Sequence, residues 1–115
     1  MSYVDAFLIP VPKSRLAEYE AMSGQMASMW KENGATAYVE CIGDDVPYGE
    51  VTSFPRAVQA KDDEVLAFGW AVYPSKEVRD ACNEKIRNDP RMANAEMPFD
   101  GKRMIFGGFE VKVER

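Results

Sequence analysis

The chain has 115 residues, of which 46% are hydrophobic, and its 14 lysine and arginine against 19 aspartate and glutamate residues give a formal net charge of −5. These values fit one compact domain over residues 1–115, and the excess of acid argues against a nucleic-acid partner, because neutralising phosphates needs a basic face. The chain contains no histidine, which excludes Ser-His-Asp and Cys-His catalysis, zinc sites with histidine ligands and a haem held by a proximal histidine.

Four segments have the composition of β-strands. They are rich in apolar and β-branched residues and are bounded by turn formers, as strands commonly are. A further segment, residues 51–60, is expected to be extended and to join the third strand as a hairpin through the charged turn at residues 61–64. Residues 91–102 are expected to form a loop. The expected strands cover residues 3–11, 35–42, 65–73 and 103–113.

Two helices are expected between these strands. After Ser14, which can act as an N-cap, apolar side chains recur at steps of three and four residues until Asn33 and Gly34 end the helix. Ser75 caps the second helix, which residues 88–90 end.

The order of these elements indicates an α+β domain. Two strand-helix-strand halves of similar length are typical of the ferredoxin-like split βαβ sandwich, in which two helices back one antiparallel sheet. We therefore expect this fold, with an extra β-hairpin segment formed by residues 51–60.

Both faces of the expected sheet are apolar. In residues 65–73 the side chains alternate between the faces, and neither the odd-numbered nor the even-numbered set contains a charge. Two helices on one side cover only one face, and a large exposed apolar face is rare on a monomer. A second copy of the chain is the simplest cover, so we expect a two-fold symmetric homodimer, with Trp70 a candidate for lining the interface or a pocket.

Several segments are similar to a known family. They are YVDAFLIPVPK, ECIGDDVPYGEVTSFPRAV, NDPRM and MPFDGKRMIFGGFE. Over nearly the whole chain, the sequence resembles the YbaA-like family of small uncharacterised bacterial proteins. This resemblance implies the dimeric α+β barrel superfamily, in which two ferredoxin-like sheets stack face to face, and it implies no established reaction.

The sequence predicts a cytoplasmic protein without a membrane segment. The longest non-polar run, residues 65–73, is less than half of a membrane span of about 20 residues. The N-terminus lacks a basic region, and Asp5 interrupts its apolar stretch. Cys41 and Cys82 have no CxxC spacing, and a reducing compartment would keep them as thiols. We expect neither a bound metal nor a cofactor.

Three carboxylates lie in expected strands, where an ionised group is costly unless it is paired. They are Asp5, Glu40 and Glu110, with Arg56 and Arg103 as available partners. A buried carboxylate can act as a general base, and an arginine can hold an anionic substrate. The alternative is that these charges form a salt-bridge network at the dimer interface.

Two loops concentrate charge beside the expected edge strands. The loop after the second strand contains Asp44 and Asp45, and Arg56 follows further along the chain. These aspartates could hold Mg²⁺ or Ca²⁺, although such residues more often cap a turn. Stacking of two sheets could bring loops of two subunits together at the dimer seam, as a site or a polar lock. The loop before the fourth strand carries the other candidates, Arg91, Asp100, Lys102 and Arg103.

Two functions fit these features, and neither fixes a reaction or decides whether the protein is an enzyme. The first is a pocket between sheet and helices that binds or transforms a small molecule, with Met22, Met26 and Met29 expected to fill the core. The second is a non-catalytic stress or assembly protein whose dimer interface is its main functional surface. A concave apolar cavity with convergent charged groups favours the first, and a filled core favours the second.

Overall fold

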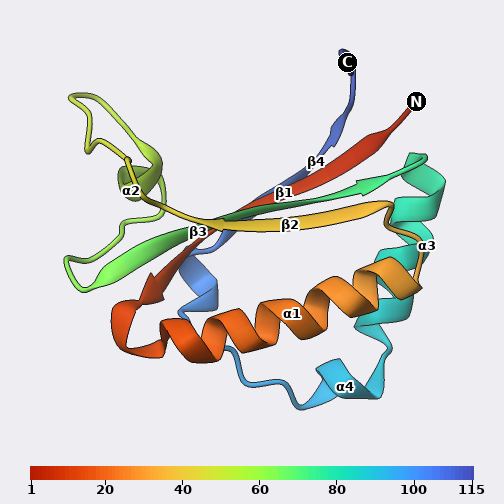
Figure 1. The fold of residues 1–115 in the computed structure, drawn as a ribbon, viewed down its shortest axis with the longest axis horizontal. Helices are drawn as coiled ribbons and strands as arrows, with labels where there is room; N and C mark the ends of the chain where they lie inside the picture. Colours follow the sequence, from red (N-terminus) through yellow and green to blue (C-terminus); the bar gives the residue numbers. More distant parts are fainter.

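The computed structural model describes residues 1–115 and contains a four-stranded antiparallel sheet with helices on both of its sides (Figure 1). This arrangement confirms the α+β class. The strands lie in the order β2-β3-β1-β4, so β2 and β4 are the edges. The strands are β1 (Tyr3–Pro12), β2 (Ala37–Ile42), β3 (Glu64–Tyr73) and β4 (Ile105–Glu110).

The helices α1 (Leu16–Glu32) and α3 (Lys76–Arg87) cover one face of the sheet, and α4 (Pro90–Ala93) lies against α3 on the same side, farther from the sheet (Figure 1). The short helix α2 (Phe54–Ala57) lies on the opposite side. No helix combines the length and the apolar composition that crossing a bilayer requires.

The two long helices begin differently. Ser75 caps α3 as predicted, because its hydroxyl accepts a hydrogen bond from the Val78 amide at 3.2 Å. The expected Ser14 cap on α1 is wrong. Residues Lys13–Arg15 form a 3-10 turn, and Arg15 occupies the N-cap position without a side-chain hydrogen bond.

Residues 51–60 do not form a strand, so the expected extra β-hairpin segment is wrong. The Ser53 hydroxyl accepts a hydrogen bond from the Arg56 amide at 3.3 Å, and Pro55 lies in the first turn of α2. A serine cap followed by proline favours the start of a helix. Asp89 caps α4, because its Oδ1 accepts a hydrogen bond from the Arg91 amide at 2.8 Å and Pro90 follows as the first helical residue. This places α4 within the expected loop.

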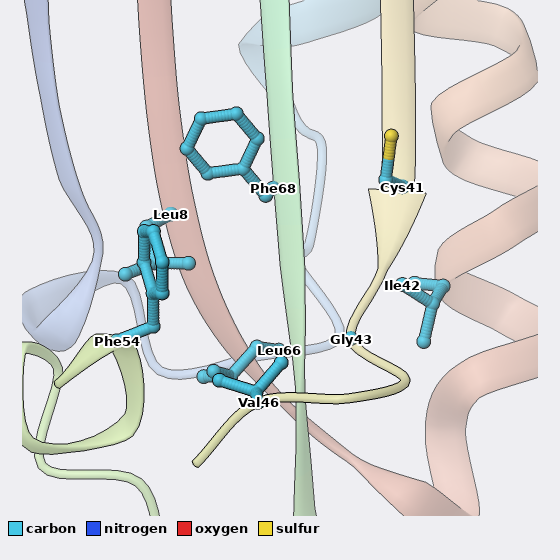
Figure 2. A pocket seen from close by; sticks show the side chains of 8 residues that line it. All are labelled: Leu8, Cys41, Ile42, Gly43, Val46, Phe54, Leu66 and Phe68. Carbon is cyan, nitrogen blue, oxygen red and sulfur yellow. The ribbon is translucent and has the colours of Figure 1, made fainter. Parts of the chain in front are cut away.

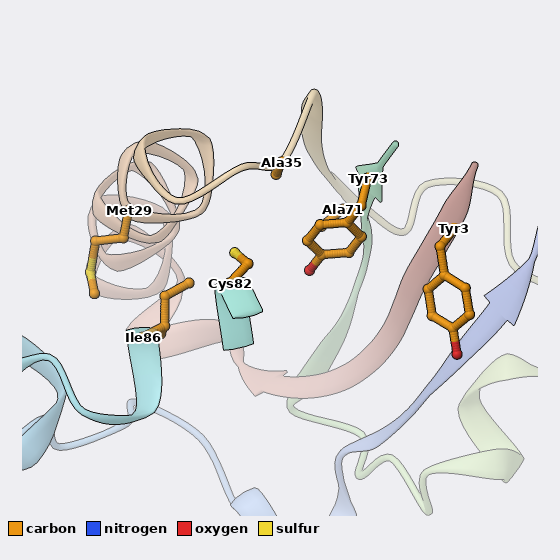
Figure 3. Packing of buried hydrophobic residues seen from close by; sticks show 7 residues of the cluster. All are labelled: Tyr3, Met29, Ala35, Ala71, Tyr73, Cys82 and Ile86. Carbon is orange, nitrogen blue, oxygen red and sulfur yellow. The ribbon is translucent and has the colours of Figure 1, made fainter. Parts of the chain in front are cut away.

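The larger core lies between the sheet and the helices. Figure 3 shows one buried cluster, to which β1, β3, α1 and α3 contribute side chains. Its members are Tyr3, Met29, Ala35, Ala71, Tyr73, Cys82 and Ile86.

The opposite face of the sheet is only partly covered. Val58, which follows α2, packs on Leu8 and Leu66 at one end of this face. The rest of the face carries exposed apolar side chains, and we call it the open face. Trp70 lies there, half-buried, in T-shaped contact with Phe68 at a ring separation of 5.9 Å. The other large exposed members of the open face are Phe54, Ile105 and Phe109.

The helix-covered side of β3 is built from very small residues. Ala67, Gly69 and Ala71 alternate along this face, opposite larger residues of β1 and β2. A Cβ atom at Gly69 would lie 2.4 Å from Cζ of Phe7, closer than packed atoms allow. The missing side chain therefore admits the Phe7 ring and leaves space above the middle of the sheet.

Candidate functional site

A cavity of about 490 Å³ lies between the helix-covered face of the sheet, the helices α1 and α3, and the chain that leads to β4. This volume is within the range of small-molecule sites. Of the 22 residues that line it, 15 are hydrophobic. The expected pocket between sheet and helices is therefore a feature of the structure, and the question is which groups it presents.

Methionine and aromatic side chains form most of the walls. Tyr19, Met22, Met26 and Trp30 line the cavity from α1, where steps of three and four residues place them on one helix face. The expectation that the α1 methionines fill the core holds for buried Met29 and for Met22, which packs against a second buried cluster while it also lines the cavity. Met26 lines the cavity. The chain after α3 adds three more methionines, Met92, Met97 and Met104.

Asp5 is the centre of a first polar group in the cavity. Its Oδ1 accepts hydrogen bonds from Nη2 of Arg79 at 2.9 Å and from Nε at 3.0 Å. Its Oδ2 accepts from the Tyr73 hydroxyl at 2.9 Å and from Nδ2 of Asn83 at 3.3 Å. We call these four residues the Asp5 group. The Asp5 side chain is 20% exposed and that of Arg79 is 23% exposed, so the pair is largely shielded from water.

The surroundings of the Asp5 group fix its geometry. The Tyr73 hydroxyl also accepts a hydrogen bond from Nε1 of Trp30 at 3.0 Å. Burial, together with the Asp5 carboxylate, raises the pKa of Tyr73 well above its ordinary value. On β4, a Cβ atom at Gly108 would lie 2.7 Å from Nη2 of Arg79. Glycine at this position therefore allows the guanidinium to reach Asp5.

Glu40 is the centre of a second polar group. Its carboxylate accepts a short hydrogen bond from the Tyr19 hydroxyl and another from the Tyr38 hydroxyl at 3.1 Å. We call these three residues the Glu40 group. Burial and the negative charge of Glu40 raise the pKa of both tyrosines well above the ordinary value. No lysine or arginine forms an ion pair with Glu40.

The two carboxylates, Asp5 and Glu40, lie in adjacent rows of the sheet. Phe7, Gly69 and Glu40 pair across β1, β3 and β2, and Asp5, Ala71 and Tyr38 form the next row. Side chains directly opposite each other in a sheet point to the same face, so both carboxylates face the helices. The small residues of β3 lie between Asp5 and Glu40 and leave space between the two carboxylates.

The predicted arginine partners of the strand carboxylates are wrong. Arg103 binds Glu64 through Nη2 to Oε2 at 2.6 Å and also donates to the Gln59 carbonyl at 2.9 Å. Its third partner is Asp100, at 3.0 Å. Arg103 therefore joins the two charged loops within one chain.

Arg56 holds its own loop. Its Nε donates to the Tyr48 carbonyl at 2.9 Å and its Nη2 to the Gly49 carbonyl at 3.1 Å. The guanidinium also stacks on the Tyr48 ring, 3.9 Å from the ring centre. These bonds direct two nitrogens of the guanidinium to the backbone of its own loop.

The remaining predicted site residues are scattered over the surface. Arg91 pairs with Asp89 and Glu32, and Glu110 pairs with Lys112 at 2.9 Å. No three histidine, cysteine, aspartate or glutamate side chains of the chain come together as a metal site, so the acidic loop does not gather its carboxylates. Asp44, Asp45 and Lys102 are exposed.

A smaller depression of about 160 Å³ lies on the open face (Figure 2). It is lined by apolar side chains such as Val46 and Leu66, with the free thiol of Cys41 at the edge strand. It presents no charged side chain that could orient a ligand. The larger cavity is therefore the stronger candidate.

The sequence analysis identified two of the central residues and missed their partners. Asp5 and Glu40 stand out as charges in apolar strands. Arg79 and Asn83 are one helical turn apart on α3, beside the apolar stripe. A polar pair on the sheet-facing side of a helix is the signal that could have paired them with a strand carboxylate.

Comparison with known proteins identifies the family of this chain. A family model described as "Protein of unknown function (DUF1428)" matches residues 2–101. The chain is 52% identical over 112 residues to "Uncharacterized protein YbaA" of Escherichia coli (strain K12), a match that covers 96% of each chain. The protein of the same name from Shigella flexneri matches with the same identity and coverage. These names assign no activity, and the matched range includes both polar groups.

Proposed function

Because the chain belongs to the DUF1428 family, whose description assigns no activity, we propose from the site alone that the cavity between sheet and helices binds a small, largely apolar molecule. The observation that carries this proposal is the combination of a volume of about 490 Å³ with apolar walls and two separate polar groups. Sites for small molecules typically combine apolar walls with a few placed polar groups that fix the orientation of the ligand.

The methionine-rich wall supports a ligand with an apolar body. Five of the seven methionines of the chain line the cavity. The thioether side chain is unbranched and polarisable, so it adapts to ligands of different shape. A wall of this kind favours contact with flexible apolar groups over recognition of one rigid outline.

The polar groups suit binding better than proton transfer. Asp5 already accepts hydrogen bonds from Arg79, Tyr73 and Asn83. These three donors already occupy both carboxylate oxygens and hold them in place. The cavity therefore offers fixed dipoles and charges for orienting a ligand.

The test uses the methionines as reporters. Protein labelled with ¹³C at the methionine methyl groups is titrated with octan-1-ol and followed by NMR. We expect the resonances of the cavity methionines to shift with a common, saturable dependence, while that of exposed Met1 stays in place. The five reporters are Met22, Met26, Met92, Met97 and Met104.

A pair of variants controls this test. Met26→Trp puts a bulky side chain into the cavity and should abolish the saturable shifts. Gln25→Trp adds the same side chain at the neighbouring, exposed position of α1 and should leave them unchanged. Equal shifts in both variants, or shifts that never saturate, contradict binding in this cavity.

We also propose that the chain forms a homodimer through the open face, and that the fold is ferredoxin-like with a dimeric α+β barrel as its assembly. The element order β1-α1-β2-β3-α3-β4 and the strand order support the fold. Exposed Phe68, Ile105 and Phe109 support the interface, since apolar patches of this kind mark contact surfaces.

The open face also favours a second candidate function. If the cavity binds nothing, the dimer interface becomes the main functional surface, as in a non-catalytic stress or assembly protein. We propose a cytoplasmic location for either function, supported by the two free thiols of Cys41 and Cys82.

A further inference from the structure

One carboxylate in the cavity has no cationic partner. Four charged residues line the cavity, namely Asp5, Glu40, Arg79 and Arg87. Asp5 and Arg79 neutralise each other at 2.9 Å. Arg87 is exposed on the last turn of α3 and forms no ion pair. Glu40 is half-buried, and its hydrogen-bond partners are two phenols.

The phenols cannot remove the charge of Glu40. Burial is the largest cause that raises the pKa of Tyr19 and Tyr38, and the hydrogen bond to Glu40 and its negative charge raise the pKa of both further. Both hydroxyls therefore stay protonated and donate their hydrogen bonds to the carboxylate. A negative charge beside an apolar cavity is costly to desolvate unless a positive group compensates it.

Aromatic rings surround the same end of the cavity. The Tyr38 ring lies 5.8 Å from that of Trp30 and 6.3 Å from that of Phe7, centre to centre. The Tyr19 ring lies 5.8 Å from that of Phe99 in an edge-to-face contact. All five rings line the cavity. Aromatic faces attract cations, and such faces combined with a carboxylate are typical of ammonium recognition.

We infer that the ligand is an apolar amine or alkylammonium, with its cationic group at Glu40 among the aromatic rings and its hydrocarbon part along the methionine wall. This inference rests on the proposed binding function and adds the charge of the ligand to it. An anion is the opposite possibility, and it would need Arg87, which is exposed to solvent rather than enclosed by the cavity.

The test compares three probes of equal chain length, octylammonium, octan-1-ol and octanoate, at neutral pH. The protein carries Trp70→Phe, which leaves Trp30 as its single tryptophan, and binding is followed by fluorescence and calorimetry. We expect octylammonium to bind about ten- to a hundredfold more tightly than octan-1-ol, the range of one charge-assisted hydrogen bond. Octanoate should bind more weakly than either.

Variants in the same background assign this preference to one residue. Glu40→Gln removes the charge and should bring octylammonium to the affinity of octan-1-ol. Glu20→Gln makes the same charge change at an exposed position of α1 and should keep the preference. If Glu40→Gln fails to fold, the order of the three probes on the Trp70→Phe protein decides the question.

The outcomes separate the two proposals. Equal affinity for octylammonium and octan-1-ol, or a preference that survives Glu40→Gln, overturns the cationic ligand and leaves apolar binding intact. Tighter binding of octanoate also overturns it and points to Arg87. Binding of none of the probes overturns the proposed function, and the inference with it.

Discussion

Arg103 and Glu64 form a bidentate ion pair, with Nη1 to Oε1 at 2.7 Å and Nη2 to Oε2 at 2.6 Å. The Glu64 side chain is only 4% exposed. Glu64 is the first residue of β3, and Arg103 lies two residues before β4. In the sheet, β1 lies between β3 and β4. The ion pair therefore crosses β1 and links the segment before β4 to the start of β3.

Replacing Arg103 should destabilise the fold. Arg103→Met leaves the Glu64 carboxylate buried without its cation, so we expect a loss of about 2 kcal/mol, between the values for exposed and fully buried pairs. Urea unfolding measures this loss. The double variant Glu64→Met/Arg103→Met should be more stable than Arg103→Met alone, because it leaves no unpaired charge. An unchanged unfolding midpoint for Arg103→Met would show that the pair contributes nothing.

The same pair should make the protein sensitive to acid. Hydrogen bonds from Arg103 hold the pKa of Glu64 below its ordinary value of 4.5. Below pH 4.5 the unfolded chain therefore binds a proton at Glu64 that the folded chain does not, and stability is lost as the pH falls through the folded-state pKa. Urea titrations across this range should show a shallower decline for Glu64→Gln than for the unmodified protein. Equal slopes for the two proteins contradict the assignment to Glu64.

The cavity tyrosines should resist alkali. Burial, with help from the neighbouring carboxylates, raises the pKa of Tyr19, Tyr38 and Tyr73 above the ordinary value of 10.0. Above pH 10 the unfolded chain loses these protons while the folded chain keeps them, so stability falls as the pH rises. Tyrosinate absorbance should show three phenols that ionise only together with unfolding, as followed by circular dichroism. Complete ionisation of all five tyrosines before unfolding would be incompatible with this result.

The proposed dimer predicts different effects for two phenylalanines of β4. Phe109 pairs with Val4 on the open face, whereas Phe106 pairs with Phe7 on the helix-covered face. Phe109→Asp puts a charge into the proposed interface and should yield a monomer of 12.9 kDa by light scattering. Phe106→Asp makes the same change three residues earlier, at a position that is 78% exposed, and should keep twice that mass. A monomeric unmodified protein would overturn the proposed dimer.

The long elements could be predicted because each carries one pattern over many residues. In α1 the steps from Tyr19 to Trp30 mark one helix face, and in β3 an uninterrupted apolar run over residues 65–73 marks a buried strand. The short helices could not be predicted in this way, because four residues contain no periodicity. Ser53 before Pro55 was the available signal, and it is local.

The candidate site was predictable only in part. A charge within an apolar strand identifies Asp5 and Glu40 as residues that need partners. The partner of Asp5 is 74 positions away on α3, and that of Glu40 is 21 positions away on α1. Both pairings depend on strand register and on how the helices lie across the sheet, which one-dimensional spacing does not contain. The two arginines that we expected as partners, Arg56 and Arg103, bind other groups.

Gly69 helps to set the volume of the cavity although it does not line it. The Phe7 ring occupies the place of a side chain at position 69, and Phe7 lines the cavity while Gly69 does not. Any larger residue at 69 would displace that ring toward the ligand space, since the strand backbone lies on the other side, with the Val39 carbonyl 2.8 Å from a Cβ atom. The volume of the site can therefore be altered from a position outside its lining, while every group in contact with the ligand keeps its identity.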